Sequence, residues 1–313
     1  MKKIGILYGR ERSFPAAFVD RINGKAVGEI RAETVLLGGT KAEDPSEYAV
    51  IIDRSPLDIP YYRAYLKWAV LQGSIVINNP FWASADDRFF GFSLAHHLGL
   101  TVPRSAVIPS KDYPQRITSE SLRNLKYPID WWQLADYVGF PAILRPISAT
   151  ITPDDFSIVS NMDELWHCYD QTGQQCMMLQ KKIDYEHFIR CFCIGKDNII
   201  PVKYDPHNRH YHVDHQHLSA ETGARVIHDA RTINEALGYE INTVDFAIVD
   251  GTPYVVDFTN PVPEFDPESI TPFYFEQIVE LMADMAIDYA LHGKPRSREL
   301  RWGRFLSGEM ARD

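Results

Sequence analysis

The chain has 313 residues, of which 45% are hydrophobic and 24% charged, and this composition is typical of a globular protein large enough for more than one core. Its net charge of −10 and pI near 5.6 argue against a protein that grips a phosphate backbone, because that task needs a basic surface. No apolar run reaches the length of a membrane span, and the start lacks a long apolar h-region and an A-x-A-like cleavage site. We therefore expect a cytoplasmic protein without nucleic-acid or membrane partners.

The first 110 residues alternate between strand and helix signals. Apolar runs that predict short strands lie at 3–9, 32–39, 48–55 and 74–79, and helical periodicity lies at 14–22, 61–73 and 86–100. This alternation predicts an α/β domain with a parallel sheet over residues 1–110. No GxGxxG follows the first strand, which disfavours the usual dinucleotide-binding fold.

The rest of the chain changes to an α+β pattern. A polar segment from Lys111 to Asp130 looks like a connection between lobes. Beyond it, strand signals end at Pro146 and lie at 156–160, 176–183, 188–195 and 198–205, with a hairpin at 243–260 and helices at 131–138, 162–173, 230–239 and 271–292. Because strands follow strands, mostly antiparallel pairing is expected. We predict a linker and first lobe at 111–180, a second lobe at 181–295 and a tail at 296–313.

The cysteines form no recognisable framework. None of Cys168, Cys176, Cys191 and Cys193 belongs to a CxxC pair, so neither a disulfide scaffold nor a cysteine zinc site is expected. Cys191 and Cys193 lie two apart in a strand-like run and therefore share a face, which indicates core packing.

Polar oxygen ligands gather in the hairpin. Asp245 lies on its first strand and Asp257 on its second, with Asn260 just beyond. If the loop around Asp250 and Gly251 has an odd number of residues, the two carboxylates share a face. Such hard oxygens suit Mg²⁺. Alternatively, Asp245 caps or pairs locally, while Asp257 and Asn260 form an Asx-type turn before the prolines.

Several segments, in this order, carry a family resemblance. They are INNPFWASADDRFFGFSLAHHLGLTVPRS, VGFPAILRP, MLQKKIDYEHFIRCFCIG and ALGYEINTVDFAIVDGTPYVVDFTNPVP. The chain resembles the ATP-grasp superfamily, most closely the branch of glutathione synthetase and the RimK-like amino-acid ligases. The resemblance implies an α/β pre-domain with a parallel sheet, followed by two antiparallel α+β lobes that clamp ATP with Mg²⁺.

The resemblance also implies roles for particular residues. Asp245, Asp257 and Asn260 would hold the metal, and Arg88 and Arg145 stand where most relatives carry phosphate-binding lysines. The other implied roles are an adenine hinge at Gln180, Lys181, Lys182 and Ile183, ribose contacts from Asp184 or Glu186, and catalytic contributions from Arg190 and Lys203. Ordinary charges compete with these roles: Arg88 as a solvated cation, Glu186 and Lys203 as surface charges, and Arg190 as an ion-pair partner.

One departure from the family divides the functional hypotheses. Relatives cover the phosphates with a glycine-rich loop, whereas here the segment ISATITPDDFSIV has no glycine and carries Asp154 and Asp155. The matches favour an ATP-dependent ligase that joins a small carboxylate to an amine through an acylphosphate. The departure favours a degenerate relative that binds nucleotide or another anion without catalysis. The branch also suggests a homodimer.

A histidine-rich segment stays outside the resemblance. It contains His207, His210, His212, His215 and His217. Three interpretations stay open: a transition-metal site, because imidazole suits zinc and copper; a contact with substrate or phosphate; and an exposed hairpin. The basic tail that follows residue 295 is interpreted as a solvated end or a subunit contact.

Overall fold

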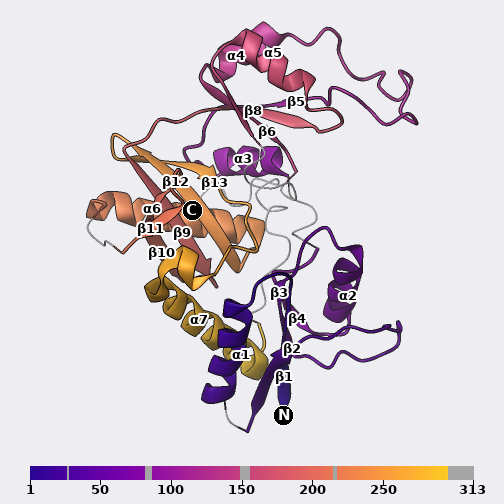
Figure 1. The fold of residues 1–313 in the computed structure, drawn as a ribbon, viewed down its shortest axis with the longest axis vertical. Coiled ribbons are helices and arrows are strands. Elements are labelled where there is room, and N and C mark those ends of the chain that lie inside the picture. The colour runs from indigo at the N-terminus through magenta and orange to yellow at the C-terminus, as the bar shows by residue number, and fades with distance from the viewer. Residues whose placement is uncertain (27, 82–86, 149–155, 214–216, 295–313) are drawn as a thin grey trace. The chain divides into compact units, whose positions relative to one another are not determined.

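A computed structural model describes residues 1–26, 28–81, 87–148, 156–213 and 217–294 (Figure 1). The chain divides into two compact units. The first consists of the described parts of Met1–Ala85, Glu186–Pro253 and Asp257–Asp313, and the second of the described parts of Asp86–Tyr185 with Tyr254–Val256. The lobe boundaries predicted at residues 110, 180 and 295 stay predictions, because they divide the chain more finely than these two units.

The parallel sheet predicted for the start of the chain is confirmed. Its strands are β1 (Lys2–Tyr8), β2 (Ile30–Thr34), β3 (Val50–Arg54) and β4 (Ile75–Ile77), in the order β2-β1-β3-β4. Side chains such as Ile4 pack with the helix α1 (Ser13–Lys25), and others such as Ile51 pack with α2 (Pro60–Leu71). Both faces are therefore buried, which explains why these strands are continuously apolar rather than alternating.

A five-stranded sheet has the order β11-β10-β9-β12-β13, and apart from Tyr254–Val256 of β13 its strands belong to the first unit. Its strands are β9 (His187–Ile194), β10 (Asn198–Asp205), β11 (His210–His212), β12 (Ile241–Val249) and β13 (Thr252–Asp257). The helix α6 (Ala220–Leu237) begins ten residues before the predicted helix, because the Ser219 side chain accepts a hydrogen bond from the Thr222 N–H and caps it. One hydrophobic core joins this sheet to β1 through α7 (Pro267–His292), whose helical backbone is interrupted at Thr271.

The second unit is a four-stranded antiparallel sheet with helices. The strands β5 (Ser105–Ile108), β6 (Ala142–Pro146), β7 (Ser157–Val159) and β8 (Met177–Lys181) have the order β5-β8-β6-β7. The helices are α3 (Arg88–His97), α4 (Trp131–Val138) and α5 (Met162–Asp170), and the last two share a core with the sheet. Asp87 caps α3 by accepting a hydrogen bond from the Phe90 N–H, so the helix begins two residues after the predicted start at residue 86.

Two sequence expectations have a direct outcome in these elements. Cys191 and Cys193 are free and fully buried in β9, so the prediction of core packing is confirmed. Among the residues that the structure describes, no helix is long and apolar enough to cross a membrane.

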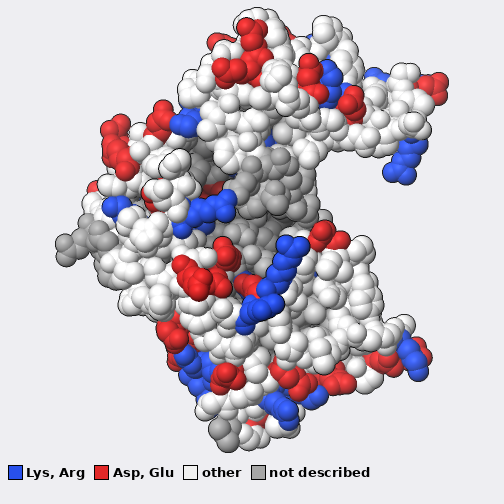
Figure 2. Space-filling model, in the orientation of Figure 1, with Lys and Arg blue, Asp and Glu red and all other residues white. Residues whose placement is uncertain are grey.

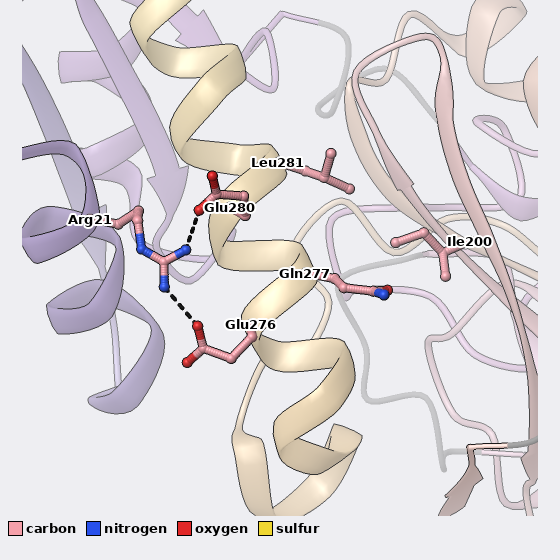
Figure 3. A pocket seen from close by; sticks show the side chains of 6 residues that line it. All are labelled: Arg21, Ile200, Glu276, Gln277, Glu280 and Leu281. Carbon is pink, nitrogen blue, oxygen red and sulfur yellow. Dashed lines mark hydrogen bonds and ion pairs between the residues drawn. The ribbon is translucent and has the colours of Figure 1, made fainter. Parts of the chain in front are cut away.

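A shallow depression of about 510 Å³ lies on the first unit between α7 and β10 (Figure 3). On one side of α7, Glu276 and Glu280 bind Arg21 of α1, whereas Gln277 and Leu281 point toward Ile200 of β10. The charges in its lining are paired with each other. None of the residues predicted to bind nucleotide or metal lines it.

Asn78, directly after β4, connects the parallel sheet to β12. Its side-chain Nδ2 donates to the carbonyls of Ile241 (2.7 Å) and Pro261 (3.2 Å), and its Oδ1 accepts from the backbone N–H of Glu240 (2.8 Å) and Ile241 (2.9 Å). Asn78 is buried, so no water replaces these bonds when they are lost. A single amide side chain thus satisfies four backbone groups from two distant segments.

We expect Asn78→Ala to lower the free energy of unfolding by about 3 kcal/mol or more, because it leaves several buried backbone groups without partners. Urea unfolding followed by circular dichroism measures the change. The exposed Asn124→Ala serves as a control and is expected to change stability by less than about 0.5 kcal/mol. Equal effects of the two substitutions would contradict a connecting role for Asn78.

Candidate functional site

The central feature of the five-stranded sheet is an ion pair between Arg190 and Asp245. The antiparallel register places these residues opposite each other on β9 and β12. The Arg190 Nε and Nη2 atoms each donate to one Asp245 carboxylate oxygen at 2.7 Å. Arg190 Nη1 donates to the Tyr211 hydroxyl at 3.0 Å, and the guanidinium carbon lies 4.2 Å from the centroid of the Tyr204 ring. The geometry is bidentate and fixed on three sides.

The surroundings fix the charges of this cluster. Burial by itself lowers the pKa of Arg190. The charge and the hydrogen bonds of the Asp245 carboxylate together raise it by more, so the net pKa lies above its ordinary value. Burial raises the pKa of Tyr211 to about 12, although Arg190 partly opposes this shift. Near neutral pH, Arg190 therefore stays a cation and Tyr211 stays a neutral hydroxyl.

A second polar network holds Asn260, which follows β13. Its backbone N–H donates to Asn242 Oδ1 at 3.0 Å, and its Nδ2 donates to Thr243 Oγ1 at 3.0 Å. Asn242 is buried and donates in turn to the Asn234 side chain and to the Phe258 carbonyl, each at 2.7 Å. Within the described part of the chain, the Asn260 amide oxygen has no hydrogen-bond partner. The orientation of this oxygen is therefore fixed by the Nδ2 hydrogen bond, and the oxygen itself is available to bind a ligand.

The metal prediction assumed that the hairpin loop has an odd number of residues, whereas the loop in the structure has two. Strand β12 ends at Val249 and β13 begins at Thr252, so the loop is the two residues Asp250 and Gly251, both with positive φ (48° and 73°). The condition of an odd loop is therefore not met, and regular pairing from a two-residue turn would place Asp245 and Asp257 on opposite faces. The shared metal site of these residues stays a prediction.

Asn260 lies on the same face of β12 as Asp245. Its Nδ2 contacts Thr243, two residues before Asp245 on this strand. Asp257 is half-buried at the last position of β13, and its Oδ1 accepts from the Phe258 N–H. The described residues contain no group of three or more His, Cys, Asp or Glu side chains that could hold a metal ion. The predicted magnesium ligands are two carboxylates and one amide, so they are not a group of this kind.

In the second unit, the two predicted phosphate-binding arginines converge on the end of β6. Arg145 is a β6 residue whose Nη1 lies 3.5 Å from the Gln180 side-chain oxygen. Arg88 begins α3, and its Nη1 donates to the carbonyls of Pro146 (3.2 Å) and Ser148 (2.5 Å). Arg88 is only 5% exposed, so the alternative of a solvated cation is wrong. The structure thus brings Arg88 and Arg145 to one strand end.

The predicted adenine hinge follows directly from β8. Gln180 is buried, and its Nε2 donates to Ser105 Oγ at 3.0 Å. The backbone N–H groups of Lys181 and Lys182 donate to the Arg104 and Pro141 carbonyls. No hydrogen bond joins the backbone N–H or C=O of Ile183 to another described residue. A ligand edge could therefore pair with the Ile183 backbone.

Three further predicted residues lie apart from these clusters. Asp184 is exposed and pairs with Lys182, which lowers the pKa of its carboxyl. Glu186 is exposed at the start of the segment that enters β9. Lys203 is opposite Ile189 in the register, whereas its neighbour Val202 is opposite Arg190, so Lys203 points to the other face of the sheet from Arg190 and Asp245.

The histidine segment forms part of a β-hairpin. His210 and His212 lie on β11, paired with β10, and their ring centroids are 4.7 Å apart. The turn before them is held by Asp205, which accepts from the backbone N–H groups of His207 and Asn208. His215 and the glycine-free segment around Asp154 and Asp155 lie outside the described residues, as does the tail beyond residue 294.

Sequence reasoning missed the residues that orient the two clusters. Tyr204 and Tyr211 enclose Arg190, while Asn242 and Thr243 position Asn260. A polar Asn242 inside an otherwise apolar strand was an available signal, since a buried amide needs partners. No local pattern indicated the two tyrosines, because their contact with Arg190 depends on the pairing of three strands.

Comparison with solved structures defines the fold. No protein-family model and no curated protein sequence matches the chain. In contrast, the fold matches a RimK domain ATP-grasp protein from Sphaerobacter thermophilus DSM 20745, with a TM-score of 0.65 and 15% identity over 91% of this chain and 99% of that one. The chain thus has the ATP-grasp fold, as its sequence resemblance predicted.

Two ligases with bound nucleotides are similar to the same extent. The D-alanine–D-alanine ligase from Bacillus anthracis, in complex with ATP, has a TM-score of 0.64 and 16% identity over 93% of this chain and 97% of that one. The ATP-grasp ligase PsnB, in complex with a precursor peptide and AMPPNP, has a TM-score of 0.64 and 14% identity over 92% and 98%. At these identities the likeness establishes the fold alone.

We expect Asp245→Asn and Arg190→Met each to lower the free energy of unfolding by about 2 to 4 kcal/mol, because each leaves a largely buried charge unpaired. In a double-mutant cycle the combined variant should cost less than the sum, with a coupling of about 1 to 3 kcal/mol. Asp184→Asn, at the exposed pair with Lys182, is the matched control and should leave the stability nearly unchanged, because solvent screens that pair. Strictly additive effects would show that the pair does not stabilise the sheet.

Proposed function

We propose that the protein is an ATP-dependent ligase that joins a small carboxylate to an amine or similar nucleophile. In this reaction the γ-phosphoryl group of ATP passes to the carboxylate, giving an acylphosphate and ADP. The amine then attacks the acyl carbon, and phosphate leaves. The observation that supports this proposal most directly is that the Asp245 carboxylate and the Asn260 side chain lie on one face of β12, and that the Asn260 amide oxygen has no partner among the described residues.

The donor set fits Mg²⁺, which prefers hard oxygen ligands and usually takes one or two carboxylates from the protein. Asp245 and Asn260 lie on one face, and Asp257 would be a third ligand at the end of β13. Each Asp245 oxygen accepts one hydrogen bond from Arg190, and a carboxylate oxygen has further acceptor capacity. When bound there, Mg²⁺ would neutralise the charge of the phosphates.

The remaining contributions come from side chains and backbone. Arg145 and Arg88 would bind phosphate oxygens at the end of β6, and the backbone of Ile183 would pair with adenine. Arg190, held as a permanent cation by Asp245, would stabilise charge that develops on the transferring group. We further assign the ribose hydroxyls to Asp184 or Glu186. The role of Lys203 in attracting phosphate stays a prediction, because its side chain points to the other face of the sheet from Arg190 and Asp245.

Similar proteins suggest the class of substrates. They include a D-alanine–D-alanine ligase, a D-Ala:D-Ser ligase from Enterococcus faecalis and a ligase in complex with a precursor peptide. We propose that the amine substrate and the carboxylate substrate of this protein are likewise amino acids or peptides. A homodimer and a cytoplasmic location stay predictions.

A second candidate function is nucleotide or anion binding without catalysis. The glycine-free segment between Ile147 and Val159 favours it, since backbone amides approach phosphates most closely where side chains are small. Under this alternative, the arginines at the end of β6 bind an anion but no acylphosphate forms.

Calorimetric titration with a non-hydrolysable ATP analogue, with and without Mg²⁺, tests the proposal. We expect binding to strengthen at least tenfold with Mg²⁺ in the wild type and to lose this dependence in Asn260→Ala, which removes the uncommitted amide oxygen. Asn124→Ala is the matched control and should bind like the wild type. No binding under any condition would exclude the ligase, whereas binding without ADP release across a set of amino acids and peptides would favour the second candidate.

Arg145→Ala separates phosphate contacts from contacts with adenine. We expect the affinity for the ATP analogue to fall about tenfold or more, while the affinity for adenosine stays within about twofold, because one charged hydrogen bond contributes roughly 1.5–3 kcal/mol. Arg104→Ala, at an exposed arginine of the same unit, is the control. Equal losses for the two ligands would mean that Arg145 supports the fold rather than the phosphates.

A further inference from the structure

The helices α4 and α5 of the second unit present two tryptophans to solvent. Trp132 of α4 is 67% exposed and Trp166 of α5 is 37% exposed, and their ring centroids lie 6.0 Å apart at an interplanar angle of 87°. The neighbouring Trp131 points inward instead and packs edge-on against Tyr169 at 4.7 Å. The core therefore needs only one of the two consecutive tryptophans, and the other adds on the order of 100 Å² of exposed, mainly apolar surface.

Carboxylates flank this tryptophan pair. On α5, Asp163 lies three residues before Trp166 and Asp170 lies four residues after it. On α4, Asp136 lies four residues after Trp132. Residues three or four apart lie on the same side of a helix, so each of these carboxylates neighbours a tryptophan. Neither helix contains a Lys or Arg. Figure 2 shows Asp and Glu side chains gathered over these helices.

Only one of these three carboxylates forms an ion pair with another described residue. Asp170 is paired with Lys111. Asp136 and Asp163 are exposed and form no ion pair with another described residue. Two aromatic faces beside two carboxylates without an ion pair among the described residues match the needs of a cation: the ring quadrupole attracts it, most strongly for Trp, and the carboxylates neutralise it.

We propose that this face of α4 and α5, defined by Trp132, Asp136, Asp163 and Trp166, docks a segment of a partner polypeptide that carries arginine or lysine. The occupant follows from charge complementarity, because an acidic partner would be repelled and a purely apolar one would leave the carboxylates unpaired. Tryptophan is the side chain most often central to such contacts, since it supplies a large rigid surface at low entropic cost. This docking surface is separate from the proposed ligase residues and does not depend on nucleotide.

The experiment is fluorescence anisotropy of a labelled peptide of alternating arginine and glycine, titrated with the full chain at 50 and 300 mM salt. We expect Trp132→Ala with Trp166→Ala to weaken binding about tenfold, and Asp136→Asn with Asp163→Asn to weaken it about threefold at low salt while reducing its salt dependence. Circular dichroism checks that each variant keeps the wild-type fold.

Matched controls separate the docking surface from the overall negative charge. Asp20→Asn with Asp197→Asn removes the same two charges from exposed positions of the first unit, and Tyr127→Ala removes an exposed aromatic side chain elsewhere on the second unit. Both controls should bind like the wild type. The proposal is overturned if the charge control weakens binding as much as the Asp136 and Asp163 variant, or if a matched glutamate–glycine peptide binds equally well. Sedimentation velocity that shows a dimer lost with the two tryptophans would also overturn it, by identifying a second copy as the occupant.

Discussion

The pairing of Arg190 with Asp245 is the interaction on which the candidate site depends. A guanidinium and a carboxylate that are both largely buried are stable only when each satisfies the other with good geometry. Here the β9–β12 register supplies that geometry, and Tyr204 and Tyr211 close the remaining sides. The pair leaves a fixed positive charge and a fixed negative charge on one face of the sheet.

The scaffold around this pair is tied together by buried amides rather than by further charges. Asn78 bonds to backbone from both sides of the β12–β13 hairpin, and Asn242 holds the chain where it leaves β13. An amide can donate and accept at once, so a single side chain satisfies several backbone groups that a loop would otherwise leave unpaired. The position of Asn260 is a product of this network.

Much of the fold could be predicted because its signals are local. Continuous apolar runs between helical segments predicted the parallel sheet, helical periodicity predicted α3 and α4, and the Asp250–Gly251 pair marked the hairpin turn. The candidate site was harder to predict, because it depends on register. The two-residue turn removes the condition under which Asp245 and Asp257 were expected to share a face, and the strand pairing separates Lys203 from Arg190.

The sequence by itself determined the class of elements, their order and the chemical types of the candidate ligands, since periodicity, caps and turn residues act over a few positions. Only the tertiary structure decided which of these side chains meet. It paired Arg190 with Asp245, turned Arg88 toward the carbonyls at the end of β6 and left the Asn260 amide oxygen uncommitted among the described residues. The reason is physical: a one-residue shift in strand pairing moves a side chain to the opposite face, and no local pattern fixes that shift.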